Sequence, residues 1–308
     1  MIWQKVCRVQ RKRKGGQMAT SISRRQWMAW AAGTGAGAAI GTQAWAQAPA
    51  AQRLVAVGGA VTEVVYALGA EALLVGTDTT SLYPEAATRT PKVGYLRQLS
   101  AEGLLSLRPD AIVGAGDAGP ATVLEQVKSA GVRVELVPAD HSFEEVLRKV
   151  AVVGAVTGRQ AQAAALAQTL KATWAQVQTA VAQATRKPRA LFILSHNGSP
   201  MVAGTGTAAH ALLTLAGAEN VVQQFAGYRP LTAEAMALVA PQVIVNSTQG
   251  IEALGGVDAF WRRPELALTP AFQRKALVAM EASHLLGFGP RMPSAVQALH
   301  TALLKATA

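Results

Sequence analysis

Two tyrosines in this sequence, each followed closely by an arginine, place a phenol beside a guanidinium. Tyr95 stands two residues before Arg97, and Tyr228 is followed directly by Arg229. A phenolate is a hard oxygen donor, and a nearby guanidinium can hold that anion or bind a carboxylate. A tyrosine in front of a helix can equally be a half-buried packing residue, so the pairs alone leave both interpretations open.

Two glutamates follow these pairs at equivalent places. Glu102 lies two residues after Ser100, and Glu234 lies two residues after Thr232. In each motif the hydroxyl can cap the first N–H groups of a helix, and the carboxylate suits the positive end of the helix dipole. Helix-start chemistry therefore explains both motifs, while their repetition leaves open a second role as paired surface carboxylates.

An internal repeat relates the two halves of the chain. The segment YALGAEALLVG matches LTLAGAENVVQ, and GYLRQLSAEGLLSLRPDAIV matches GYRPLTAEAMALVAPQVIV, with Pro109 aligned on Pro241. Such similarity predicts that one structural unit occurs twice. The first half carries about fifteen extra residues, 78–94, before its tyrosine, and we expect this insertion to line one side of a cleft.

Short apolar runs alternate with helix-period segments and predict the βα order of parallel sheets. The expected strands are 54–57, 73–77, 111–114, 133–137, 189–194, 221–223, 243–246 and 276–280. Between the halves, an Ala-, Gln- and Leu-rich stretch from Gln160 to Thr185 contains no Gly or Pro. It predicts one helix of about 26 residues that ends before Pro188.

The first 46 residues have the composition of an export signal. They carry eight basic and no acidic side chains, followed by an Ala- and Gly-rich apolar stretch. The segment SRRQWM at 23–28 resembles a twin-arginine signal, and AWA at 44–46 fits a signal-peptidase site. We expect residues 1–46 to be removed and the mature protein to lie in the periplasm, with Met18 as an alternative start.

Charge and cysteine content narrow the function classes. Removal of the signal leaves 21 basic against 18 acidic side chains. The large positive net charge of the full chain, which would favour nucleic-acid binding, is therefore mostly lost in the mature protein. The single cysteine, Cys7, leaves with the signal, and the mature chain then forms no disulfide, thiolate metal site or covalent haem attachment. No later stretch reaches membrane-spanning length, and the 5 histidines are too sparse for a zinc or manganese carrier.

From about Arg53 to the C-terminus the sequence resembles periplasmic binding proteins whose two lobes are joined by one rigid helix, and within them the haem-binding branch. The matching segments are VGGAVTEVVYALG, VGYLRQLSAEGLLSLRPD, SPMVAGTGTAAHALL and LLGFGPRMP. The resemblance implies an α/β fold with two Rossmann-like lobes, mainly parallel central sheets and one long interlobe helix. We expect a first lobe at 47–158, the helix at 159–187 and a second lobe at 188–308.

The resemblance also implies what the protein carries. It predicts a monomeric carrier, not an enzyme, that binds ferric haem between its lobes and delivers it to an ABC importer of the inner membrane. Tyr95 would be the axial iron ligand, because phenolate favours ferric iron, and Arg97 would hold the phenolate or reach a haem propionate. Glu102 and Glu234 would dock onto arginines of the permease.

Three residues of the second lobe are candidates to cover the other face of the haem: His196, Tyr228 and Arg229. His196 follows the strand 189–194, at the end where open α/β sheets place ligands. It is either a second ligand or an ordinary loop histidine. Tyr228 is the repeat mate of Tyr95, and Arg229 could meet a propionate. Arg291, in the last matching segment, has either a structural or a ligand-contacting role.

Two alternatives remain open. The same fold could carry cobalamin or a ferric siderophore, and the segment at 94–97 is what favours haem. An exported α/β enzyme is a different class: Gly58 and Gly59 follow a strand as in nucleotide loops, but neither a G-x-G-x-x-G nor a G-x-S-x-G motif is present.

Overall fold

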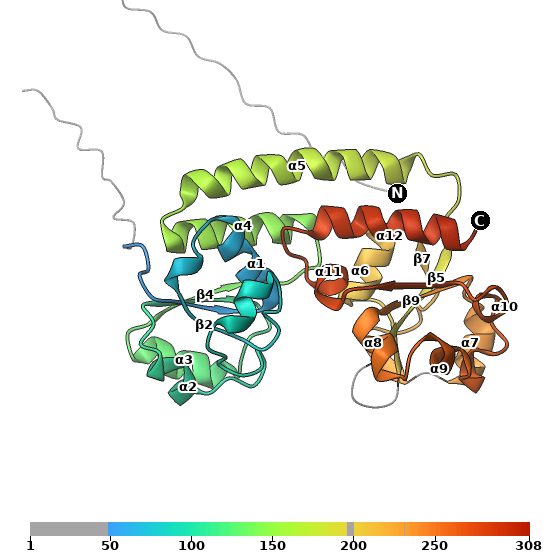
Figure 1. Cartoon of the computed structure of the whole chain (residues 1–308), viewed down its shortest axis with the longest axis horizontal. Coiled ribbons are helices and arrows are strands. Elements are labelled where there is room, and N and C mark those ends of the chain that lie inside the picture. The colour runs from blue at the N-terminus through green and yellow to red at the C-terminus, as the bar shows by residue number, and fades with distance from the viewer. Residues whose placement is uncertain (1–48, 196–199, 231) are drawn as a thin grey trace, which may run out of the picture. The chain divides into compact units, whose positions relative to one another are not determined.

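The computed structural model describes residues 49–195, 200–230 and 232–308 (Figure 1). Its first sheet has four parallel strands in the order β2-β1-β3-β4. These are β1 (Leu54–Val57), β2 (Leu74–Thr77), β3 (Ala111–Ala115) and β4 (Arg133–Val137). The helices of this half are α1 (Gly59–Ala67), α2 (Ala101–Ser106), α3 (Ala121–Ser129) and α4 (Phe143–Thr157), with 3-10 turns η1 (Glu71–Leu73) and η2 (Glu85–Arg89). All four residues of β1 are buried, as expected for a parallel strand covered on both faces.

The second sheet combines a parallel part with an antiparallel extension. Its strands are β5 (Arg189–Leu194), β6 (Met201–Ala203), β7 (Glu219–Asn220), β8 (Tyr228–Pro230), β9 (Val243–Ser247) and β10 (Leu277–Met280). β7, β5, β9 and β10 pair in parallel, whereas β6 runs antiparallel to both β5 and β8. The helices are α6 (Ala208–Leu215), α7 (Ala233–Val239), α8 (Thr248–Ala253), α9 (Val257–Trp261), α10 (Pro270–Arg274), α11 (Ala282–Leu286) and α12 (Met292–Ala306), with η3 (Pro264–Leu266).

The two sheets repeat one path, which confirms the internal repeat seen in the sequence. The order β7-β5-β9-β10 in the second half corresponds to β2-β1-β3-β4 in the first. Side-chain contacts repeat as well. Nη2 of Arg53 donates to the carbonyl of Leu107 at 2.7 Å. At the equivalent place, Nη2 of Arg189 donates to the carbonyl of Val239 at 2.8 Å.

A long helix, α5 (Gln160–Ala182), connects the halves. Its 23 residues span about 35 Å at 1.5 Å per residue, and it ends three residues before the predicted Thr185. The chain enters it through Gly158, whose φ of 72° ends α4 in the left-handed conformation that glycine adopts most readily. α5 packs on α4 and on α12 (Figure 1). Trp174 of α5 stacks on Phe143 of α4 with ring centroids 5.1 Å apart.

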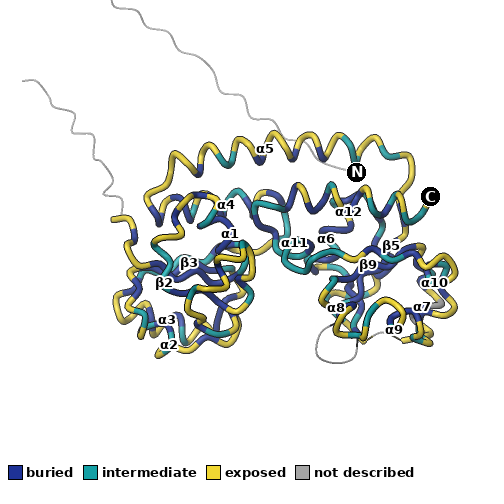
Figure 2. Tube along the Cα trace, viewed as in Figure 1, coloured by how far each residue is buried: buried dark blue, intermediate teal, exposed yellow. Residues whose placement is uncertain are grey.

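One apolar cluster includes residues of both halves. It runs from Leu54 of the first sheet through Trp174 of α5 and Leu299 of α12 to Phe192 of the second sheet. Figure 2 shows buried segments in both sheets and along the sides of α4 and α12 that face them. Residues 48–308 accordingly form one compact unit. The α/β fold with parallel central sheets is confirmed, while the lobe boundaries at 158 and 187 stay predictions.

Three strand predictions begin at the wrong residue: those at 221–223 and 73–77, and the one at 276–280, where β10 begins at Leu277. The strand expected at 221–223 lies earlier, at Glu219–Asn220. The Asn220 side chain donates to the carbonyl of Ala203 at 3.0 Å and accepts from the backbone N–H of Val222 at 3.2 Å. An asparagine that bonds the backbone two residues ahead favours a turn over a strand. Leu73, expected to begin a strand, ends η1 instead. No helix in the described part of the chain is long and apolar enough to cross a membrane.

Candidate functional site

Tyr95 lies at the carboxyl end of the first sheet because the chain folds back beside β2. The backbone N–H of Val93 donates to the carbonyl of Thr77 at 3.0 Å, and that of Thr79 donates to the carbonyl of Gly94 at 2.9 Å. Gly94 has a φ of 96°, a conformation in which L side chains are strained, and it turns the chain into Tyr95. Tyr95 is 38% exposed, so its phenol is accessible to a ligand.

The inserted residues 78–94 are held by buried polar contacts. Both carboxylate oxygens of Asp78, which is fully buried, accept hydrogen bonds from Gly58, Thr80 and Ser81 at 2.6–3.0 Å. Nζ of Lys92 donates to Thr77 and to two backbone carbonyls of the insertion at 2.9–3.0 Å. Tyr95 therefore follows a segment that is fixed to the sheet.

A chain of three polar side chains defines the site in the first half. Nη1 of Arg97 donates to the phenol oxygen of Tyr95 at 2.8 Å. Nε of Arg97 donates to Oδ2 of Asp117 at 3.0 Å, and Nη2 forms an ion pair with the same oxygen. Burial lowers the pKa of Arg97, but the hydrogen bonds and charges of Asp117 and Tyr95 outweigh this and raise it. The guanidinium therefore stays charged beside the phenol.

Asp117 is the residue of this site that sequence reasoning missed. It follows β3, and ligands of parallel sheets lie beyond the carboxyl ends of strands. That position was the available signal: a carboxylate two residues after a buried apolar strand. The backbone also links its loop to the tyrosine loop, because Gly119 donates to the carbonyl of Leu96 at 2.8 Å and accepts from Leu99 at 2.9 Å.

Tyr228, the repeat mate of Tyr95, lies in a different environment. Burial raises the pKa of its phenol, while a hydrogen bond with Thr207 and the charge of Arg97 lower it by less. Arg97 thus donates a hydrogen bond to Tyr95, and its charge also acts on Tyr228, although the two tyrosines come from different sheets. Arg229 is exposed and its guanidinium carbon lies 4.5 Å from the ring centroid of Phe225.

The two glutamates occupy equivalent helix starts, as predicted. Glu102 lies in the first turn of α2, where Oγ of Ser100 accepts from the backbone N–H of Gly103 at 3.1 Å. Glu234 lies in the first turn of α7. Both glutamates are exposed, so both carboxylates are accessible to a partner.

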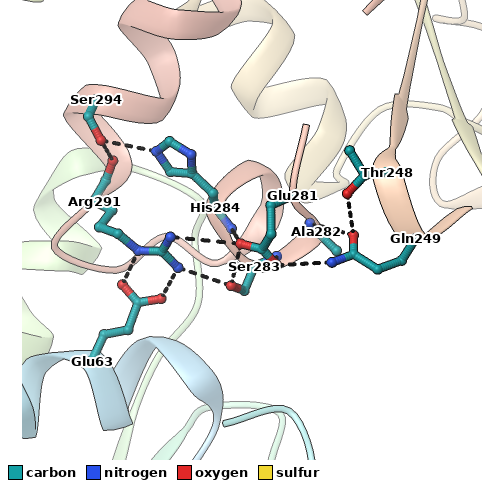
Figure 3. Close-up of polar contacts among 9 residues, drawn as sticks. All are labelled: Glu63, Thr248, Gln249, Glu281, Ala282, Ser283, His284, Arg291 and Ser294. Carbon is teal, nitrogen blue, oxygen red and sulfur yellow. Dashed lines mark hydrogen bonds and ion pairs between the residues drawn. The ribbon is translucent and has the colours of Figure 1, made fainter. Parts of the chain in front are cut away.

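Arg291 joins side chains from both halves, which answers the question left open by the sequence. Nε and Nη2 of Arg291 donate to the two carboxylate oxygens of Glu63 on α1 at 2.9 and 2.6 Å (Figure 3). Nη2 also donates to Ser283 of α11 at 3.0 Å, and the guanidinium carbon lies 3.6 Å from the ring centroid of Tyr83. Its contacts within the protein support the structural role.

His196 lies outside the described residues, as do the predicted signal peptide, Cys7 and Met18. Two of the other histidines have partners within the protein. His300 is buried and its Nδ1 lies 2.8 Å from the carbonyl of Ala216, and Nε2 of His284 lies 3.0 Å from Oγ of Ser294. Within 49–195, 200–230 and 232–308, no group of three or more His, Cys, Asp or Glu residues is arranged to hold a metal ion.

Two surface hollows lie elsewhere. One of about 960 Å³ is lined by residues of the second half that include Trp261 and Lys275. Another, of about 330 Å³, is lined by residues that include His141, Trp174 and His210. Neither includes a predicted site residue, so the candidate site is defined by the polar contacts of Tyr95 and not by these hollows.

Comparison with known proteins gives a consistent family. The model of the periplasmic binding protein family matches residues 54–283. Among solved structures, the periplasmic heme-binding protein BhuT in complex with two hemes is 43% identical, with a TM-score of 0.81 over 84% of this chain and 100% of that chain. The periplasmic heme-binding protein RhuT from Roseiflexus sp. RS-1, in apo form, is 33% identical, with a TM-score of 0.79 over 83% and 99%.

Curated relatives are more distant. An uncharacterized ABC transporter substrate-binding lipoprotein, YvrC of Bacillus subtilis, is 27% identical over 196 residues, which is 62% of this chain and 62% of that protein. A cobalamin-binding protein of Halobacterium salinarum is 26% identical over 249 residues, which is 78% of this chain and 66% of that protein. The chain thus spans slightly less than two thirds of each of these relatives.

Proposed function

The chain belongs to the periplasmic binding protein family, and from this premise we propose that it binds ferric haem and delivers it to an ABC importer of the inner membrane. The observation that carries the proposal is the exposed phenol of Tyr95 with a guanidinium N–H on its oxygen. The similarity to BhuT and RhuT, both heme-binding proteins, supports the same cargo. We propose that the protein acts as a carrier without catalytic activity, as a monomer.

In this proposal Tyr95 is the axial ligand of the haem iron. A phenol must lose its proton to bind Fe³⁺ as an anion, and Arg97 stabilises that anion through the N–H already directed at the oxygen. Tyr228 contributes differently, because burial favours its neutral phenol, which can donate a hydrogen bond. Arg229 is exposed and would meet a propionate, and His196 stays a candidate contact from the second lobe by its place in the sequence.

Export and delivery complete the proposal. The basic, acid-free first 46 residues support transport to the periplasm by the twin-arginine route and removal of the signal. Glu102 and Glu234 are exposed at equivalent helix starts of the two repeats. We propose that these two carboxylates dock onto basic residues of the permease, one from each lobe.

A second cargo class is supported by a specific observation. The curated relative from Halobacterium salinarum is a cobalamin-binding protein. A tyrosine phenolate is an established axial ligand of haem iron. The exposed Tyr95 with its paired Arg97 therefore favours haem over cobalamin for this chain.

Titration of the purified mature protein with hemin tests the proposal. We expect a Soret shift and a tyrosinate–iron absorption band in the wild type. Tyr95→Phe should remove that band and weaken hemin binding by at least about 100-fold, since even residues that only support a metal ligand change affinity by about 10–100-fold. Tyr66→Phe, a change of the same kind on α1, is the matched control and should bind normally.

Other results would contradict the proposal. Unchanged hemin affinity and spectrum in Tyr95→Phe would remove Tyr95 as the ligand. Failure of the wild type to bind hemin, together with tight binding of cobalamin in the same titration, would favour the second cargo.

A further inference from the structure

We propose that Asp117 is a positioning residue for Tyr95: it fixes the orientation of Arg97 so that Nη1 of the guanidinium stays on the phenol oxygen. The inference rests on the proposed function, because the orientation of Arg97 matters for binding only if Tyr95 is the iron ligand. It adds a residue that the motif at 94–97 does not contain.

The geometry of the guanidinium carries the first step. Nε and Nη2 form one edge of the planar fork, and both engage Oδ2 of Asp117. Because the group is rigid and planar, a carboxylate that holds this edge also fixes the direction of Nη1. Nη1 is the atom that donates to Tyr95 at 2.8 Å. Asp117 therefore acts on the phenol through Arg97 without touching it.

The loop of Asp117 is itself fixed by the first sheet. A Cβ added to Gly116 would lie 2.9 Å from both Cα of Pro138 and the carbonyl oxygen of Val137, so this glycine permits a close approach of two backbones. On the other side, Gly119 bonds the backbone of Leu96 and Leu99. The loop that carries Asp117 is thus held between the end of β4 and the tyrosine loop.

Loss of the Asp117 carboxylate would release the Nε–Nη2 edge of the guanidinium. The long arginine side chain could then rotate, and the donor on Tyr95 would be present only part of the time.

Exposure argues against a purely structural role for the pair. The side chains of Arg97 and Asp117 are 59% and 42% exposed. Ion pairs this exposed contribute little to folding stability, because water screens them and ordering two side chains costs entropy. An effect of Asp117 on ligand binding should consequently appear without a matching loss of stability.

Nuclear magnetic resonance of the haem-free mature protein tests the positioning directly. In the wild type we expect a protected Nε–H signal of Arg97 and a nuclear Overhauser contact between Arg97 and the Tyr95 ring. Asp117→Ala should lose both, while Asp117→Asn, which keeps an oxygen acceptor, should retain the contact. Persistence of both signals in Asp117→Ala would overturn the inference, whatever the protein binds.

Hemin titration of the same variants adds a functional measurement. Asp117→Ala should weaken binding by about 10-fold and reduce the tyrosinate–iron band, and Asp117→Asn should restore most of both. In an Arg97→Ala background, Asp117→Ala should change affinity by less than about 2-fold, because the path through Arg97 is already lost. Full additivity of the two changes would contradict the inference.

Glu125→Ala is the matched control. It removes the carboxylate of another exposed ion pair, with Lys128, on the same half of the protein. It should leave hemin binding, the NMR contact and the melting temperature unchanged. If the wild type bound no hemin while the NMR contact still depended on Asp117, the proposed cargo would fail and the positioning role would stand.

Discussion

The two repeat-related tyrosines, Tyr95 and Tyr228, differ in exposure and in hydrogen bonding although they come from the same motif. Tyr95 is exposed and receives a guanidinium N–H, whereas Tyr228 is half-buried at the start of β8 and its pKa is raised by burial. Since a raised pKa favours the protonated phenol, Tyr228 stays neutral near neutral pH. The repeat alone could not reveal this difference, because it arises from the antiparallel extension β6–β8 that only the second sheet has.

This difference predicts the outcome of changing each phenol. Tyr228→Phe should retain the tyrosinate–iron band of the hemin complex and weaken binding by no more than about 10-fold, the range of one lost hydrogen bond. The measurement is the visible hemin titration, with Tyr95→Phe beside it. Loss of the band in Tyr228→Phe would mean that the roles of the two tyrosines are exchanged.

At the scale of secondary structure, the contact of α1 with the start of α12 depends on a largely buried ion pair. Glu63 on α1 is 6% exposed and holds Arg291 through two hydrogen bonds (Figure 3). Burial raises the pKa of Glu63, and Arg291 offsets part of that rise. Arg291→Ala should therefore raise the pKa further and lower the free energy of unfolding near neutral pH by about 2–4 kcal/mol.

The pH dependence of this loss has a definite sign. In the variant, the pKa of Glu63 in the folded state lies above the unfolded value near 4.5. Between the two values the folded chain binds more protons, so stability rises as pH falls through that interval. Denaturant unfolding at several pH values should show that the difference in free energy of unfolding between the wild type and Arg291→Ala becomes smaller as the pH falls toward 4.5. Arg148→Ala, which breaks an exposed pair, is the control, and an equal loss at every pH would refute the assignment.

The sequence predicted the elements well where burial and periodicity agree. The strands 54–57, 133–137 and 189–194 have the bounds that their apolar runs indicate. It failed at 221–223, where the side chain of Asn220 bonds the following backbone. The contacts of Asp117 and Thr207 could not be predicted for another reason: they involve residues 20 and 21 positions away, which only the folded chain brings together.

At the scale of the whole molecule, the repeat places one exposed glutamate at the same point of each half. Replacement of both Glu102 and Glu234 by Ala should lower haem uptake in cells by about 10-fold or more, because both proposed contacts with the permease would be lost. Hemin affinity of the purified variant should stay unchanged. Unaltered uptake would remove these residues from the docking surface.

Glu144 provides the matched control for this experiment. It is also an exposed glutamate in the first turn of a helix, α4, whereas α11 and α12, the helices that follow β10 in the other half, have no acidic residue in their first turns. Glu144→Ala should leave uptake unchanged, which separates docking at the paired sites from a general effect of lost surface charge.

The shared apolar cluster has a consequence for the order of events during synthesis. Val296, Leu299 and Leu303 of α12 belong to the same buried cluster as Leu54 and Val64 near the beginning of the described chain. This shared cluster therefore cannot be completed before α12 packs onto it. The first half also has an apolar cluster of its own, which includes Val55, Leu104 and Ile112 and does not depend on α12.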